Sequence, residues 1–212
     1  MLNLRFVRST LVAAALVLVG SLAPAAAAAQ SAATQFVQTL GDRAIVELTD
    51  KSVADGERVK RMRALLVSSF DVPEVGRFVL GNYWNSASEQ EKQDFLTYYS
   101  IVVAHTYAGL FKKYSGETFQ VLRERAIDDN NTVVYGQINP PNGGQPVPVE
   151  ITAKKQPDGG YKAVDIRVEK ISMPLTHRKE YASVIQRNQG KVDGLIKALK
   201  AKAESLEGQT PS

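Results

Sequence analysis

The strongest constraint on the fold is a strict alternation of apolar and polar residues in the C-terminal half of the chain. Apolar side chains take every second position in two segments, at Val147, Val149, Ile151 and Ala153 and again at Val164, Ile166 and Val168. Polar side chains and one proline fill the positions between them. A two-residue period puts the two kinds of side chain on opposite faces of a strand. The chain must therefore build a sheet with one buried face and one face in water.

Four segments have strand character: 117–126, 131–138, 146–154 and 161–171. Short runs rich in Asp, Asn and Gly separate them, and such runs suit hairpin connections. Because each connection is short, neighbouring strands must run in opposite directions. We therefore expect a four-stranded antiparallel meander.

Helical patterns flank the sheet in the sequence. Apolar residues at three- and four-residue spacing predict helices over 34–51, 59–70, 178–188 and 192–203. Asp71 is the expected N-cap of a further short helix, with Pro73 in its first turn and Gly81 at its end. Ser88 and Glu91 have the spacing of a capping box, which opens the longest helix, over about 89–114.

The longest helix is apolar around most of its circumference, so it must be covered on several sides. Together with the one-sided sheet, this predicts an α+β fold in which helices pack over a four-stranded antiparallel sheet. The sequence has neither an internal repeat nor an evident interdomain linker. We expect one domain over 30–205 and a flexible tail over 206–212.

The first 29 residues have the order of a Sec signal peptide. Arg5 and Arg8 precede an apolar run of about 12 residues over 11–22, and the run of alanines over 25–29 follows. A span across a bilayer needs about 20 apolar residues, so this run is too short for a retained anchor. We expect cleavage near Ala29 and export of the mature chain to the periplasm.

Composition excludes several functions. The chain has no Cys, so it has no disulfide framework, thiol nucleophile or Cys-based metal site. Only two His residues are present, which argues against zinc. Lys and Arg number 26 against 22 Asp and Glu, and two of the arginines fall in the leader, so the mature chain is too nearly neutral to favour nucleic acid. We expect no cofactor and no metal.

Catalytic residues do not converge in the sequence. His105 stands among apolar residues of the longest predicted helix, and Asp165 lies on the polar face of its strand. His177 stands beside basic residues at the start of a predicted helix, where a surface position is expected. The basic cluster within 58–63 is interpreted as a solvated helix face. The sequence therefore predicts that the protein is not an enzyme.

Aromatic residues are concentrated at Tyr83-Trp84 and along the longest helix, for example at Tyr99, Tyr107 and Phe111. Aromatic residues at helical spacing commonly build a core, and that interpretation stays open here. The alternative is that they line a cavity between the helices and the sheet. An empty cavity costs stability, and a hydrocarbon ligand would remove that cost.

Several motifs resemble one known family. They are Phe70-Asp71-Val72-Pro73, the segment 79–84 that ends in Asn82-Tyr83-Trp84, the segment 164–172, Arg178 and the segment 190–196. In this order they are similar to the MlaC / toluene-tolerance auxiliary family of periplasmic lipid-binding proteins. The resemblance spans essentially the whole mature chain.

Two departures from that family point to one of its branches. The family usually has Gly where Lys170 stands, and often an aromatic-asparagine pair where this chain has Thr176-His177. The segment 172–186 resembles the hopanoid-associated, HpnM-like branch instead. The resemblance therefore leaves two ligands open, a glycerophospholipid and a hopanoid.

The resemblance implies a fold related to the cystatin and nuclear-transport-factor-like class, with lipid tails in an apolar pocket between the layers and the headgroup exposed. It implies a soluble carrier that shuttles lipid between the outer and inner membranes for an ABC-linked transport system. The implied partners are an outer-membrane lipoprotein complex and the substrate-binding subunit of an inner-membrane ABC transporter.

The hypothesis for the lipid-binding site draws on helices and sheet together. From the helices we expect Phe78, Val79, Tyr83, Trp84, Phe95, Tyr99, Val103 and Tyr107. From the sheet we expect Val134, Val149, Ile151, Val164, Ile166 and Val168. Two alternatives remain: a small-molecule enzyme with Asp165 or His105 as base, and a lipid-free envelope adaptor whose interior is filled by its own side chains.

Overall fold

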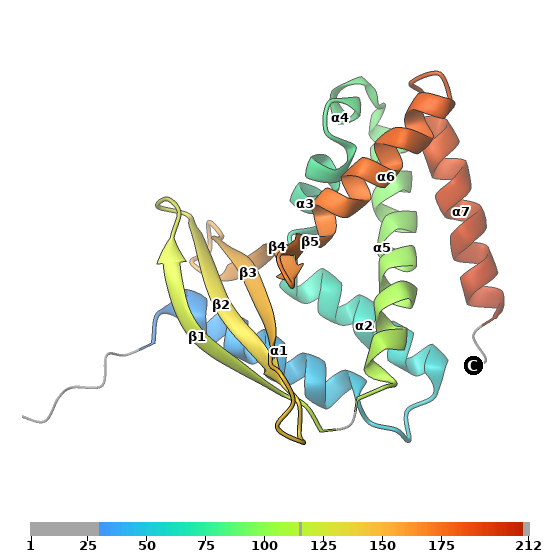
Figure 1. Ribbon diagram of the computed structural model, residues 1–212. Helices are drawn as coiled ribbons and strands as arrows, with labels where there is room; N and C mark the ends of the chain where they lie inside the picture. The colour runs from blue at the N-terminus through green and yellow to red at the C-terminus, as the bar shows by residue number, and fades with distance from the viewer. Residues whose placement is uncertain (1–29, 115, 210–212) are drawn as a thin grey trace, which may run out of the picture.

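A computed structural model describes residues 30–114 and 116–209 (Figure 1). The predicted signal peptide lies outside the described residues, as does the end of the tail. The helices are α1 (Ala32–Leu48), α2 (Asp55–Ser69), α3 (Val72–Leu80), α4 (Tyr83–Ser86), α5 (Glu89–Phe111), α6 (Met173–Arg187) and α7 (Val192–Gly208). The strands are β1 (Thr118–Ala126), β2 (Asn131–Asn139), β3 (Val147–Lys155), β4 (Tyr161–Val168) and β5 (Ile171–Ser172). Helix α7 continues beyond residue 205, where the tail was expected to begin.

The sheet is an antiparallel meander in the order β1-β2-β3-β4-β5. It has one strand more than expected, because the segment 161–171 breaks at a tight turn. Glu169 and Lys170 have φ angles of 51° and 68°, and Ile171 returns beside Val168. Two successive left-handed residues are the signature of a two-residue hairpin turn. A side chain at the second of them is strained, which explains why glycine suits position 170.

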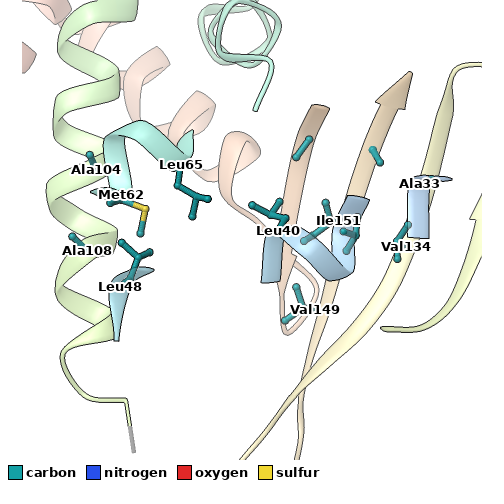
Figure 2. Close-up of a cluster of buried hydrophobic side chains, with 13 residues drawn as sticks. Ala33, Leu40, Leu48, Met62, Leu65, Ala104, Ala108, Val134, Val149 and Ile151 are labelled. Atoms are coloured by element: carbon teal, nitrogen blue, oxygen red, sulfur yellow. The ribbon is translucent and has the colours of Figure 1, made fainter. Parts of the chain in front are cut away.

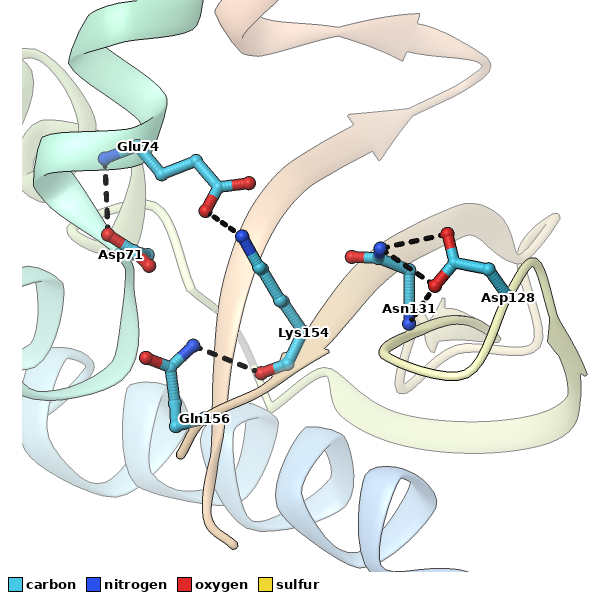
Figure 3. A network of polar contacts seen from close by, with 6 residues as sticks. All are labelled: Asp71, Glu74, Asp128, Asn131, Lys154 and Gln156. Atoms are coloured by element: carbon cyan, nitrogen blue, oxygen red, sulfur yellow. Dashed lines mark hydrogen bonds and ion pairs between the residues drawn. The ribbon is translucent and has the colours of Figure 1, made fainter. Parts of the chain in front are cut away.

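Side chains close the turns and begin the helices as the sequence predicts. Asp128 accepts from the backbone N–H groups of Asn130 and Asn131, at 2.9 Å each, and so closes the β1–β2 turn (Figure 3). Ser88 and Glu91 form the expected capping box of α5. Asp71 accepts from the Glu74 N–H at 3.1 Å and caps α3.

Helix α1 lies along the apolar face of the sheet, and α2 joins it to α5 (Figure 1). The last two helices lie mainly against other helices, although the start of α6 also contacts β4. Helix α6 packs chiefly on α3, and α7 packs on α5. This placement follows from the apolar circumference of α5, which needs cover on the side that faces away from the sheet.

Two polar contacts join the start of α3 to the sheet. The Asp71 N–H donates to the Ala163 carbonyl at 3.0 Å, so the chain just before α3 runs beside β4. Glu74 forms an ion pair with Lys154 of β3 (Figure 3). These contacts fix the start of α3 and of α6, which packs on it, relative to the sheet.

The buried apolar residues form two clusters. The sheet-side core lies between the sheet, α1, α2 and α5, as Figure 2 shows, and contains Ala33, Val37, Leu40, Leu48, Met62, Leu65, Ala104, Ala108, Val134, Val149, Ile151, Ala153 and Ala163. The helix-side core lies among α3, α5, α6 and α7, and contains Val75, Val79, Leu80, Ala87, Phe95, Tyr99, Val103, Ile185, Val192, Leu195, Ile196 and Leu199. Helix α5 contributes to both.

Arg58 corrects the expectation of a solvated basic face on α2. Its side chain is buried, with 4% exposure, and its guanidinium donates to the carbonyls of Leu48, Asp50 and Val53. These carbonyls belong to the end of α1 and to the α1–α2 loop, where backbone acceptors lack helical partners. Arg58 therefore caps α1 from the neighbouring helix.

Candidate ligand cavity

A cavity of about 520 Å³ lies where the two cores meet. Its walls come from α1, α2, the start of α3, α5, α6 and the apolar face of the sheet. The lining is overwhelmingly apolar, and its larger members are Leu40, Ile45, Met62, Leu65, Leu66, Phe70, Tyr99, Val103, Tyr107, Leu110, Phe111, Tyr114, Phe119, Ile138, Val149, Ile151, Ile166, Val168 and Met173. The volume falls in the usual range of small-ligand pockets, about 300–1,000 Å³. The side chains therefore leave space that an apolar ligand can fill.

The structure brings half of the predicted lining residues to this cavity, namely Tyr99, Val103, Tyr107, Val149, Ile151, Ile166 and Val168. Val79, Tyr83 and Phe95 pack in or against the helix-side core, where α6 and α7 cover them. Val134 is fully buried in the sheet-side core.

Phe78 and Trp84 line a different hollow, a surface groove of about 790 Å³ between α3 and α6. Charged and polar side chains, among them Arg77 and Arg178, share its lining. The Arg178 guanidinium lies 5.1 Å from the centre of the Phe78 ring. The groove is larger than the cavity, but its polar lining makes it the poorer match for hydrocarbon.

Val164 misses the cavity because β4 contains a bulge. Thr152 pairs with Asp165, whereas the next residue, Ala153, pairs with Ala163. Val164 is thus the extra residue, and an extra residue reverses the alternation on one side of it. Ala163 takes the inward position in its place and is fully buried.

Sequence reasoning missed the part of the wall that α1, α2 and β1 provide. Phe119 of β1 is the clearest case, because its ring lies against two glycines. A Cβ at Gly41 would lie 2.2 Å from Phe119 Cδ1, and one at Gly136 would lie 2.8 Å from Phe119 Cζ. Glycine at both positions makes room for an aromatic side chain in this wall. The two glycines were the available signal in the sequence.

His177 also corrects an expectation, since its side chain is half-buried rather than exposed on the surface. It lines the cavity from α6 and lies between two tyrosines of α5. Its Nδ1 is 3.0 Å from the Tyr99 hydroxyl, and its Nε2 is 3.2 Å from the Tyr107 hydroxyl. Its ring stacks on that of Tyr181, with 5.9 Å between the ring centres. Burial lowers the pKa of His177, and Glu180 opposes this shift more weakly.

The candidate bases of the enzyme alternative are placed away from the cavity. Asp165 accepts from Arg167 Nε and from the Ser172 hydroxyl, each at 2.8 Å, and does not line the cavity. His105 lies on α5 outside the lining as well. Within residues 30–114 and 116–209, no group of three or more His, Asp or Glu side chains is arranged to hold a metal ion. Over the same residues, no helix combines the length and hydropathy that a membrane crossing requires.

A one-sided antiparallel sheet, helices over its apolar face and a cavity between them define an α+β domain with an internal hydrophobic cavity. The chain matches the MlaC protein family over residues 38–201 and belongs to this family. The resemblance seen in the sequence motifs is thereby confirmed.

Two relatives extend this result. The intermembrane phospholipid transport system binding protein MlaC of Haemophilus influenzae is 25% identical over 130 residues, which span 60% of this chain and 60% of that protein. A phospholipid-binding protein from Ralstonia solanacearum, solved in complex with a phospholipid, superposes with a TM-score of 0.72 at 24% identity. The superposition covers 82% of this chain and 98% of that one. It confirms the predicted α+β fold.

Proposed function

We propose that this protein is a periplasmic lipid carrier that holds the apolar part of a membrane lipid in the cavity and performs no catalysis. The cavity of about 520 Å³ between α1, α2, α5 and the sheet carries this proposal. Family membership and the names of the two relatives, a phospholipid transport binding protein and a phospholipid-binding protein, support it. A lipid-free adaptor would have no use for such a cavity, which lowers its stability.

The physical task explains why a carrier needs such an interior. Each methylene group moved from hydrocarbon to water costs about 0.8 kcal/mol. A two-chain lipid with about 30 methylenes therefore resists free transfer through water by roughly 25 kcal/mol. Only a protein that covers nearly all of that surface makes the transfer feasible, and two full chains need a pocket at or above the large end of the usual range, about 1,000 Å³. The cavity of about 520 Å³ must therefore widen to hold both chains. The polar headgroup stays in water, where it needs no dedicated site.

The proposal includes the route and the partners. The leader directs the chain to the periplasm, where lipid passes between an outer-membrane lipoprotein complex and the substrate-binding subunit of an inner-membrane ABC transporter. The ligand is a phospholipid or, if the branch assignment from segment 172–186 holds, a hopanoid. Loading requires the cavity walls to move apart, and a docked partner would favour the open state by binding it more tightly.

Lipid extraction tests the proposal directly. The mature chain, purified from the periplasm without detergent, is expected to yield about one lipid per protein when the extract is analysed by mass spectrometry. The same protein stripped of lipid should regain it from vesicles. If extraction finds no lipid and the stripped protein takes none up, the protein is not a carrier.

Cavity-filling variants locate the site. Val149→Trp and Ile166→Trp place an indole in the cavity, and each is expected to reduce lipid uptake at least tenfold without unfolding the chain. Val67→Trp is the matched control, because Val67 is 56% exposed on α2 and does not line the cavity. Normal uptake by all three variants would place the lipid elsewhere.

A further inference from the structure

The cavity wall contains few groups that can form hydrogen bonds, and most of them are already satisfied. The Ser100 hydroxyl donates to the Leu96 carbonyl at 2.7 Å. The Tyr114 hydroxyl donates to the Glu117 carbonyl at 2.6 Å. Lys113 is exposed at the end of the lining, where water solvates it, and Glu117, which is half-buried beside it, has a partner of its own. Among the described lining residues, this leaves the trio of Tyr99, Tyr107 and His177.

The three side chains of the trio have one polar hydrogen more than their mutual hydrogen bonds use. A neutral imidazole has one N–H donor and one lone pair, and each tyrosine hydroxyl has one hydrogen. Both imidazole nitrogens are engaged, one by each tyrosine. One tyrosine must donate to the lone pair, and the other must accept from the N–H. The accepting tyrosine keeps its own hydrogen in either tautomer, so one O–H donor at the cavity wall is left over.

The protonation states support this count. Burial raises the pKa of Tyr99 and that of Tyr107, so both hydroxyls keep their hydrogens. Burial lowers the pKa of His177, so the imidazole is neutral at neutral pH. A spare donor in an apolar wall is costly unless a ligand or water accepts from it.

We propose that the trio of Tyr99, Tyr107 and His177 donates a hydrogen bond to an acyl ester carbonyl of the bound lipid. This inference rests on the proposed carrier function and names a subsite within its cavity. A single neutral donor matches a neutral acceptor, whereas a phosphate would need cationic partners in so apolar a wall. Ester carbonyls are the first polar atoms that follow the tails of an ester-linked lipid. The site therefore favours ester-linked lipids over lipids that lack a carbonyl at this depth.

The experiment compares two lipids of equal chain length and headgroup, a diester and a diether phosphatidylcholine, in competition for the lipid-stripped protein. One net hydrogen bond corresponds to about a fivefold preference for the diester. The infrared band of a ¹³C-labelled ester carbonyl should also move to lower frequency in the bound lipid than in an apolar solvent.

The test variant combines Tyr99→Phe, Tyr107→Phe and His177→Leu, because any single change leaves another donor in the trio. It should lose both the preference and the shift of the carbonyl band. Tyr161→Phe is the control, since Tyr161 stacks on Phe36 away from the cavity lining and should retain both.

The outcomes separate the subsite from the carrier function. Uptake of neither lipid by the wild-type chain would refute the carrier function itself. Equal uptake of both lipids with an unshifted carbonyl band would refute the subsite and leave the carrier intact. A diester preference that survives in the triple variant would also refute the subsite. Should the triple variant fail to fold, the wild-type competition and carbonyl band still decide.

Discussion

The two cores of this protein are built from different side chains, and only one of them borders extensively on open space. Alanine supplies five of the thirteen buried residues in the sheet-side core, but only Ala87 among the twelve of the helix-side core. The helix-side core contains the large, fully buried Phe95, Ile185 and Leu195, whereas the largest side chain buried as fully in the sheet-side core is Leu48. The cavity borders the sheet-side core at Leu40, Met62, Leu65, Val149 and Ile151, whereas large interlocking side chains fill the helix-side core. The protein thus combines a tightly packed helix-side core with a cavity beside the sheet-side core.

Helix α5 shows how one element serves both purposes. Near its start, Phe95 is fully buried in the helix-side core, and its ring stacks on that of Tyr99 with 5.4 Å between centres. Further along, Tyr107, Leu110 and Phe111 line the cavity. The apolar circumference of α5 is therefore divided between a tightly packed stretch and an open one, and the contrast can be tested position by position.

The largest expected effect comes from truncating one phenylalanine in each region. Phe95→Ala removes a fully buried ring from the solid core and should lower the free energy of unfolding by about 3–5 kcal/mol. Phe111→Ala removes a half-buried ring from the cavity wall and should cost only about 1–2 kcal/mol. Urea unfolding of both variants measures the difference. Equal losses would mean that the two regions are equally well packed.

Enlarging an alanine should destabilise the protein more in the helix-side core than at the cavity wall. Ala87→Leu adds volume to the packed core and should destabilise the chain by about 1–3 kcal/mol. Ala44→Leu adds the same volume at the cavity wall, where there is room, and should change stability by less than about 1 kcal/mol. Ala44→Leu should also reduce lipid uptake. A large destabilisation by Ala44→Leu would show that the cavity closes in solution.

A substitution at Lys170, remote from both cores, should change the free energy of unfolding without affecting the cavity. Lys170 has a φ of 68° in the β4–β5 turn, where glycine is unstrained. Lys170→Gly should therefore raise the free energy of unfolding by about 1 kcal/mol while lipid uptake stays the same. Thermal unfolding measures the gain. Loss of stability on this substitution would show that the turn is not strained.

The smallest expected effect is a dependence of stability on pH through His177. Burial lowers the pKa of His177 from its ordinary value of 6.5, so the unfolded chain binds this proton at higher pH than the folded chain does. The stability that the neutral imidazole provides is complete above about pH 6.5 and is lost as the pH falls through the folded-state pKa.

The measurement compares urea unfolding at pH 7.5 and pH 5.5 for the wild type, His177→Gln and His105→Gln. Burial also lowers the pKa of His105, but less of that side chain is buried. His177→Gln should flatten the profile more than His105→Gln. The reverse order would place the main pH-sensitive group on the outer side of α5.

Local patterns predicted most of the fold. The alternation in β3 and the capping box of α5 each depend on neighbours a few residues apart, and the structure confirms both. The bulge at Val164 was not predicted, because Val164 continues the apolar alternation of Ile166 and Val168, and only the pairing with β3 reveals the extra residue. The turn at Lys170 was hidden for a similar reason, since nothing in the strand pattern marks it.

The candidate site was only half predictable. The alternation of apolar and polar residues in the strands predicted which face of the sheet is apolar, but it did not predict which part of that face α1 covers. Val134 and Val149 share the pattern and are both buried in the sheet-side core, yet only Val149 borders the cavity. His177 was misplaced because its partners, Tyr99 and Tyr107, lie on a helix distant in the sequence. Arg58 was misplaced because its partners are backbone carbonyls at the end of α1 and in the α1–α2 loop, which no pattern of side chains marks.

The buried arginine at the α1–α2 corner has a mechanical consequence. By binding three carbonyls at once, Arg58 makes this corner stiff, so α1 and α2 should move as one bracket fixed to the sheet. Movement is then expected in the opposite wall, beyond the fixed start of α6, where α6 meets α5 through side-chain contacts of His177 and Tyr181. The cavity would thus open by movement of α6 away from α5, while α1, α2 and the sheet keep their relative positions.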